Sequence, residues 1–310
     1  MNLFGTVLTN SAPSANYRGE SAENRAVVQK ITKGRFEYPI ISPEAMRNAL
    51  RETLRGMGLP CNRTRLHDEE QLAVKFEDYP DHERFADDFF FGWLVAASGN
   101  DRKKIVEEMK KRGRDTETFT FKRDSIVRMN LAVALEPYRY DSVFTQSPKD
   151  ASDKNKKAHV NVENSQLLHR ETTYTAYQYP FALNLNDCKV RPDWTRALLR
   201  AIGELNNVAG NHARSYFEMA PASIVVRLTP RLAAGYSTYA FKIHDDERHE
   251  LPGIVDGILN DDYPGSEFFF GGKVARDLGE KTVNALKEKG ATTERTPQKI
   301  LEIVAEKGLA

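Results

Sequence analysis

Residues 42–58 read SPEAMRNALRETLRGMG and hold the start, the body and the end of one helix. Ser42 can cap the first turn, Pro43 suits the first helical position, and Glu44 complements the helix dipole at that end. The apolar residues of the body follow helical spacing and are Met46, Leu50, Leu54 and Met57. Glycines at the end and the proline that follows stop the helix. The sequence therefore predicts an amphipathic helix here.

Strand patterns lie on both sides of this helix. The predicted elements are, in chain order, a strand over Leu3–Thr9, the helix, strands over Ile126–Leu135 and Thr172–Leu185, a helix over Asp193–Asn207, and a strand over Ala222–Thr229. Pro180 favours an edge or a bulge for the third strand. The order β-α-β-β-α-β is that of ferredoxin-like folds and of RNA-recognition modules. Because many unrelated proteins share this order, it does not assign a function.

Three stretches interrupt the pattern. Residues 10–35 are polar and basic, which predicts a long loop, of the kind that is functional or disordered. Residues 60–125 are charged and patchily helical, most clearly over 101–112, and show no strong strand. Residues 137–169 lose apolar content around a lysine-rich centre at 149–157, which predicts an extended hairpin.

Composition limits the partners and the compartment. The net charge of +1 gives no global basic field, so nucleic-acid binding would depend on local patches. Cys61 and Cys188 stand alone, which indicates reduced thiols without a disulfide or a zinc knuckle. The longest apolar run, 89–97, is far shorter than the roughly 20 residues of a membrane span. We expect a cytoplasmic protein with no membrane partner.

Two blocks carry a resemblance to a known family. Residues 5–58, GTVLTNSAPSANYRGESAENRAVVQKITKGRFEYPIISPEAMRNALRETLRGMG, resemble the opening of the DevR-type backbone subunits of type I CRISPR complexes, members of the RAMP superfamily. Residues 211–224, NHARSYFEMAPASI, are similar to the family segment that precedes the last sheet strand. The two blocks occur in the family's order, with insertions where the family has its fingers and thumb.

The resemblance implies an α+β fold with a hand-like shape. A ferredoxin-like, RRM-like βαββαβ palm would carry a helical fingers insertion and a β-hairpin thumb. The implied boundaries are 1–59 for the first half of the palm, 60–125 for the fingers, 126–136 for a palm strand, 137–170 for the thumb hairpin, 171–230 for the second half of the palm, and 231–310 for a C-terminal palm extension.

The resemblance also implies a function. The chain would be a non-catalytic subunit that oligomerises along the guide RNA spacer and kinks it periodically, so that the guide can pair with target DNA. Its partners would be guide RNA, target DNA through the guide, further copies of itself, and the other Cascade subunits. These are an end-capping RAMP subunit, the large subunit, the small subunit and the guide-processing endonuclease. Neither a cofactor nor a metal is expected.

A protein that holds an arbitrary guide cannot read bases and must grip phosphates and riboses with cations, amides and helix N-termini. The candidate RNA-binding residues are Asn16, Tyr17, Arg18, Arg25, Lys30 and Lys33 in the polar stretch, Ser42, Arg47 and Arg51 on the first helix, Lys156, Lys157 and His159 in the hairpin, and His212 and Arg214 in the second block.

Each candidate group has a structural alternative. The arginines of the first helix, including Arg55, can pair with Glu44 and Glu52 on a solvated face, and we assign Arg55 to such pairing. The hairpin tip can be an ordinary surface loop. His212 can cap the end of the preceding helix.

Two other function classes compete with a passive RNA-binding role. Backbone subunits of the related type III complexes cleave bound RNA with an acidic residue in the loop after the first strand. This chain offers Glu20 and Glu23 there but no aspartate, and two-metal chemistry needs converging carboxylates. His244 and His249 lack the H-E-x-x-H spacing of a helical zinc site. A protein-interaction or regulatory module that uses the acidic part of residues 60–125 is the third class.

Overall fold

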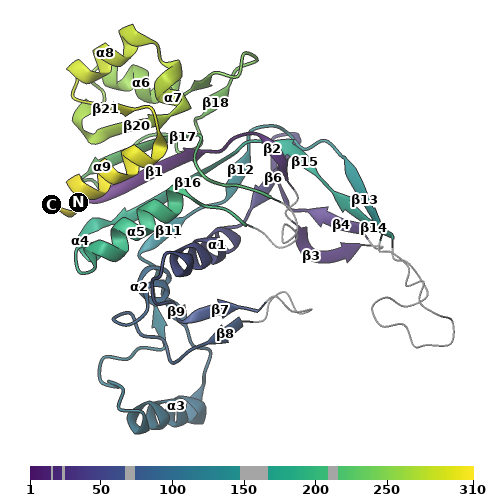
Figure 1. Ribbon diagram of the computed structural model, residues 1–310, viewed down its shortest axis with the longest axis vertical. Coiled ribbons are helices and arrows are strands. Elements are labelled where there is room, and N and C mark those ends of the chain that lie inside the picture. The colour runs from purple at the N-terminus through teal and green to yellow at the C-terminus, as the bar shows by residue number, and fades with distance from the viewer. Residues whose placement is uncertain (15–16, 23–24, 67–73, 147–166, 209–215) are drawn as a thin grey trace.

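The computed structural model describes residues 1–14, 17–22, 25–66, 74–146, 167–208 and 216–310, and a nine-stranded sheet forms its centre (Figure 1). The sheet runs in the order β21-β20-β17-β1-β16-β12-β6-β5, and β11 also pairs with β16. Its strands are β1 (Asn2–Leu8), β5 (Lys30–Lys33), β6 (Phe36–Ile41), β11 (Val127–Met129), β12 (Ala132–Ala134), β16 (Tyr177–Asn184), β17 (Ser223–Thr229), β20 (Phe268–Gly272) and β21 (Thr292–Glu294). All neighbours are antiparallel except β20 and β21. The predicted α+β class is confirmed at this level.

Three helices cover one face of the sheet and enclose the larger hydrophobic core. They are α1 (Pro43–Gly56), α5 (Pro192–Gly203) and α9 (Pro297–Leu309), and the short α4 (Leu185–Cys188) lies beside α9. Helix α1 begins as predicted, because Ser42 Oγ accepts the Ala45 N–H at 3.2 Å and Pro43 follows the cap. Leu50, Ile202 and Val304 bring one fully buried side chain from each helix into this core.

The C-terminal part of the chain covers the opposite face. Helices α6 (Pro252–Leu259), α7 (Lys273–Asp277) and α8 (Glu280–Glu288) belong to this layer, with a 3₁₀ turn over Gly265–Glu267. Along β20 the side chains alternate, so that Phe269 enters the first core while Phe268 and Phe270 enter the second. RNA-recognition modules stack bases on aromatic rings of an open sheet face. Here the rings are buried by the chain itself and are unavailable for such stacking.

His249 ties this C-terminal layer to the sheet. It lies on β19 (His249–Glu250), which pairs with β18 (Lys242–Ile243). Its Nδ1 forms a hydrogen bond of 2.7 Å with Ser223 Oγ, and that hydroxyl also accepts the Val274 N–H at 2.8 Å. Burial, with the nearby Lys273 ammonium, lowers the pKa of His249 to about 4. The imidazole is therefore neutral at pH 7.

Pro180 lies in the middle of the central strand β16, so the predicted edge position is wrong. β11 ends opposite Phe181, and β12 pairs only from Gln178 onward. The interruption between β11 and β12 thus faces Pro180, where the Asn130 N–H donates to the Pro180 carbonyl at 3.3 Å. The N–H that proline lacks falls at this gap in the ladder.

The long loop predicted for residues 10–35 is also wrong, because most of the described residues form strands. They are β2 (Ala12–Ser14), β3 (Tyr17–Ala22), β4 (Arg25–Val28) and β5. β2 pairs with β15 (Thr173–Thr175), while β3 and β4 pair with each other. Pairing with the distant β15 extends β2, whereas β3 and β4 are extended partly by pairing with each other.

Residues 60–125 form a lobe below α1 in Figure 1. Its elements are β7 (Arg63–Arg65), β8 (Val74–Phe76), α2 (Ala86–Phe91), β9 (Trp93–Leu94), α3 (Gly99–Lys111) and β10 (Lys122–Arg123). The helix predicted over 101–112 is confirmed by α3. The expected lack of strands is wrong, since β7 pairs with β8 and β9 with β10. In the described part of the chain, no helix has the length and apolarity that a membrane crossing requires.

Candidate nucleic-acid interface

A second, four-stranded sheet joins the two segments that sequence analysis singled out separately for RNA. Its order is β13-β14-β4-β3, with β13 at Ser142–Gln146 and β14 at Leu167–Glu171. β14 runs parallel to β4, pairing His169 with Arg25 and Arg170 with Ala26. This sheet projects to one side of the central sheet in Figure 1. The polar N-terminal stretch and the base of the predicted thumb hairpin are therefore one surface.

β13 and the residues just before it carry exposed apolar side chains. Tyr140, Val143 and Phe144 are 60%, 52% and 59% exposed. The Phe144 ring lies 4.2 Å from the His169 ring, centroid to centroid, across the β13–β14 pair. Exposed rings of this kind can stack on unpaired bases. These residues were not predicted from the sequence, because the hairpin stands out there for its lysines rather than for its aromatic rings.

Lys30 lies at the edge of this region, where its charge already has partners. Its Nζ lies 3.9 Å from the centroid of the Tyr138 ring, 3.7 Å from a Glu37 carboxylate oxygen and 4.0 Å from Glu171 Oε2. Glu171 is buried and also accepts the Val28 N–H at 3.1 Å. Lys30 therefore balances a buried carboxylate. Lys33, by contrast, is exposed, with its Nζ 5.9 Å from the centroid of the Tyr38 ring.

The start of α1 offers little to a phosphate. Ser42 Oγ is used by the Ala45 N–H, and the Met46 N–H donates to the Ser42 carbonyl at 3.2 Å. Pro43 has no N–H, and the Glu44 side chain adds a negative charge at this point. Ser42 is thus a helix cap in this structure, and the free donors that an anion needs at a helix N-terminus are mostly consumed.

The three arginines of α1 have different environments. Arg47 is half-buried, and its Nε is buried without a hydrogen-bond partner among the described residues. Arg51 is only 8% exposed, and its Nε donates to Asp87 Oδ2 at 3.1 Å. Arg55 pairs with Glu52 at 3.5 Å, as predicted, and donates to the Arg63 carbonyl.

The geometry of Arg51 corrects its assignment to RNA. Its Nη1 donates to Asn48 Oδ1 at 2.8 Å, and its guanidinium lies 5.0 Å from the centroid of the Phe91 ring. The structural alternative named Glu44 and Glu52 of the same helix as its partners. The carboxylate that pairs with Arg51 is instead Asp87, on α2. Arg51 therefore joins α1 to the lobe of residues 60–125, and Arg47 is left as the candidate cation of this helix.

The other candidate residues are placed only in part. Tyr17 and Arg18 lie on β3 and Arg25 on β4, as far as the backbone is described. The candidates outside the described residues are Asn16, Lys156, Lys157, His159, His212 and Arg214.

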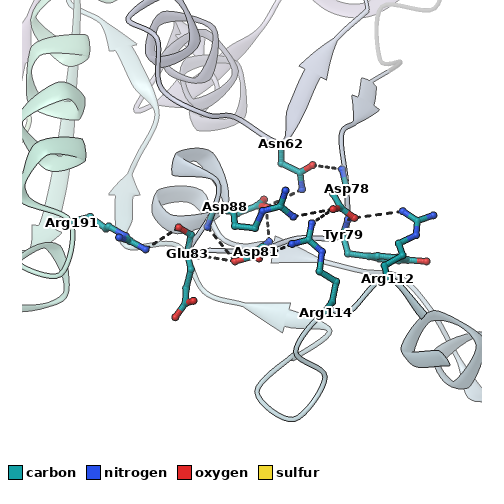
Figure 2. A network of polar contacts seen from close by, with 10 residues as sticks. Asn62, Asp78, Tyr79, Asp81, Glu83, Asp88, Arg112, Arg114 and Arg191 are labelled. Carbon is teal, nitrogen blue, oxygen red and sulfur yellow. Dashed lines mark hydrogen bonds and ion pairs between the residues drawn. The ribbon is translucent and has the colours of Figure 1, made fainter. Parts of the chain in front are cut away.

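Polar contacts hold the loops of the 60–125 lobe together (Figure 2). The Asp78 carboxylate receives Arg84 at 3.0 Å, Arg112 at 3.6 Å, and Arg114. Asp88 accepts the Asn62 amide and the Asp81 N–H, each at 2.9 Å. Burial raises the pKa of Asp88 to about 6. These groups are structural, because their charges are directed at one another.

The far end of this lobe carries four exposed lysines, interspersed with the exposed Glu107 and Glu108, which were not predicted as a site from the sequence. Lys103, Lys104, Lys110 and Lys111 of α3 are all exposed. The two lysine pairs are seven residues apart, which places them on one side of the helix. This seven-residue spacing, in a helix predicted from the sequence, is the feature from which these lysines could have been identified.

Comparisons with known proteins agree with the resemblance drawn from the sequence. No family model matches the chain. The curated protein "CRISPR-associated protein Cas7/Cst2/DevR" of Myxococcus xanthus (strain DK1622) is 29% identical over 296 residues, which are 90% of this chain and 89% of the relative. A chain of the solved "CRISPR RNA-guided surveillance complex, pre-nicking" superposes with a TM-score of 0.60 at 12% identity, over 99% of this chain and 100% of that one. A chain of another "CRISPR RNA-guided surveillance complex" gives a TM-score of 0.56 at 12% identity, over 99% of each chain. Both of these solved chains share their fold with the present chain.

Proposed function

This chain resembles the Cas7/Cst2/DevR type of CRISPR-associated protein along most of its length, and from this premise we propose that it is a backbone subunit of a type I CRISPR effector complex. It holds guide RNA without cutting it, oligomerises along the spacer, and kinks the RNA so that it can pair with target DNA. Its other partners are the end-capping, large and small subunits and the guide-processing endonuclease of the complex. The cytoplasm is its proposed compartment.

The strand arrangement supports a ferredoxin-like palm. The four strands β17, β1, β16 and β12 are adjacent and antiparallel, and α1 and α5 connect them on one face. We assign the palm to 1–59, 126–136 and 171–230, with an extension over 231–310. The lobe of residues 60–125 is the fingers, and 137–170 is the thumb hairpin.

One observation carries the RNA-binding proposal: the parallel pairing of β4 with β14. It places the polar N-terminal stretch beside the thumb, so that one extended strand of RNA can contact both. We assign phosphate binding to Arg47 and Lys33, with Lys30 at the edge of the surface. Phe144 and Tyr140 supply rings that splay bases, which costs little where the RNA is already single-stranded.

The first experiment is purification of the chain from cells, followed by measurement of its absorbance ratio and oligomeric state. Copurified RNA and a ladder of oligomers are expected. A nucleic-acid-free monomer or dimer would contradict the proposal and favour a protein-interaction module. Loss of the bound RNA on addition of Mg²⁺ or Mn²⁺ would contradict its non-catalytic part and favour the nuclease alternative.

The second experiment tests the grip of Arg47. Arg47→Ala should weaken binding of single-stranded RNA equally for unrelated sequences, and lower the slope of log affinity against log salt by about 0.7, as one lost phosphate contact does. Arg200→Ala is the matched control, because Arg200 is an exposed helical arginine paired with Glu204 at 2.9 Å. Equal binding by both variants would remove Arg47 from the interface.

A further inference from the structure

The fingers contain a cavity of about 250 Å³ that the proposed grip on RNA does not use. It opens between the loops around residues 79–83 and 114–120. Its principal lining residues are Tyr79, His82, Trp93, Arg114, Phe119 and Arg123. The cavity is large enough for one planar heterocycle and too small for a helix.

The β9–β10 pair fixes the shape of this cavity. Trp93 and Arg123 face each other in the pair, and the Trp93 Nε1–H donates to the Thr120 carbonyl at 2.8 Å. Gly92 has φ +63°, and a Cβ there would overlap the Arg123 carbonyl oxygen. The indole is therefore held in place by its hydrogen bond, and the two strands approach closely because residue 92 has no side chain.

Aromatic rings form the walls. The Trp93 and Phe119 rings are nearly parallel, at 9°, with centroids 6.5 Å apart. The His82 ring lies 6.2 Å from Trp93. Flat π-surfaces of this kind stack on nucleobases without regard to sequence.

Arg123, one of the lining residues, has a polar atom without a partner in the described part of the chain. Arg123 Nε is buried, and no acceptor for it exists among the described residues. Its guanidinium lies 5.8 Å from the Trp93 centroid and 6.0 Å from that of Phe89, so it is held between rings. A buried donor without an acceptor is costly, and a ligand carbonyl oxygen would satisfy it.

The charges around the cavity distinguish a base from a phosphate. Asp81, Glu83 and Asp115 line it, and Arg114 is already directed at Asp78 and Asp81, as Figure 2 shows. A phosphate would meet carboxylates here, whereas a neutral ring would not.

We propose that this cavity binds the nucleobase of an unpaired nucleotide, stacked on Trp93 and Phe119, with a carbonyl oxygen or a ring nitrogen of the base accepting the Arg123 Nε–H. The phosphates remain outside, beyond the carboxylates. The proposal rests on the proposed function, because it requires a single-stranded nucleic acid held close to the fingers. It assigns the fingers a contact that tolerates every base.

The test uses Trp93 as its own reporter. The chain has two tryptophans, and Trp194→Phe leaves Trp93 alone. The full chain is titrated with an oligonucleotide of six abasic units and with the same oligonucleotide carrying one restored base. Quenching of Trp93 is expected only with the restored base, with a gain in affinity of about fivefold or more, the range of one base–aromatic stack.

Variants separate the cavity from the rest of the protein. Phe119→Ala should abolish the gain from the restored base, while Phe76→Ala, an exposed ring on β8, should retain it. Arg123→Lys, which keeps a cation but moves the donor, should reduce the gain and covers the case in which Phe119→Ala does not fold. Circular dichroism checks each fold.

The outcomes distinguish this proposal from the proposed function. Binding of both oligonucleotides with equal affinity and no quenching overturns the nucleobase cavity, while retention of long RNA leaves the phosphate grip intact. Failure to bind any RNA overturns both. A Trp93 signal that appears when copies assemble without RNA shows that a protein side chain fills the cavity, and overturns the nucleobase assignment.

Discussion

The buried contact between Arg51 and Asp87 yields a prediction that separates a structural arginine from an RNA-binding one. Asp87 is 1% exposed and also accepts the N–H groups of Asn62 at 2.7 Å and Arg63 at 3.0 Å. Removing one partner of a buried ion pair costs roughly 3–5 kcal/mol. Because two backbone donors remain on Asp87, we expect Arg51→Ala to lower the free energy of unfolding by about 3 kcal/mol, the low end of that range.

The assay is urea denaturation followed by far-ultraviolet circular dichroism and by tryptophan fluorescence. The Trp194 ring lies 5.9 Å from the Phe89 ring, two residues beyond Asp87, so its emission reports on the junction between palm and fingers. Fluorescence should change at lower urea than circular dichroism if the fingers separate first, because a local unit can open before the whole chain unfolds.

Arg55→Ala is the matched control on the same helix. Arg55 forms a partly exposed pair with Glu52, and such pairs contribute about 0–1 kcal/mol. The reasoning would be refuted if Arg51→Ala were no more destabilising than Arg55→Ala. It would also be refuted if Arg51→Ala kept full stability and lost RNA affinity, the result that a phosphate-binding arginine gives.

Three further perturbations test other features. Ser42→Ala should cost about 0.5–2 kcal/mol in urea denaturation by removing the cap of α1, whereas Ser42→Asp should restore the stability. His249 has a folded pKa of about 4, below its ordinary 6.5, so the unfolded state takes up a proton first; stability falls as pH drops from about 6.5 to 4. Relative to His249→Gln, the wild type should lose up to roughly 3 kcal/mol over that window, measured as urea midpoints at each pH, and parallel curves would contradict this. Gly92→Ala should destabilise the fingers by more than the ~1 kcal/mol of an ordinary glycine substitution, because its Cβ meets the Arg123 carbonyl; fluorescence-detected unfolding unchanged from wild type would contradict the β9–β10 geometry.

Local signals in the sequence were sufficient for the core elements. The cap at Ser42 and the periodicity of α1 are encoded within a few residues, and so is the β-forming, largely apolar character of β1 and β17. Fold class follows from their order. Polar strands were misread: β4 pairs with the distant thumb strand β14, and β3 completes this sheet by pairing with β4.

The residues of the candidate site were harder to predict from the sequence for a similar reason. Arg51 has the same chemistry as Arg47 in the sequence, and only the folded position of Asp87 separates them. Pro180 predicts an edge strand unless the break between β11 and β12, which lies opposite it, is known. Charge and propensity are local properties, whereas burial and pairing depend on the whole chain.

The β4–β14 pairing also has a consequence for biosynthesis. Arg25 leaves the ribosome long before its partner His169, so β4 can pair with β3 but not with β14 while the intervening segments are made. Closing so long a loop places this pairing among the late steps of folding. A nascent chain therefore completes helix α1 before it acquires the surface that we assign to RNA, which delays capture of a guide until more than half of the polypeptide has been made.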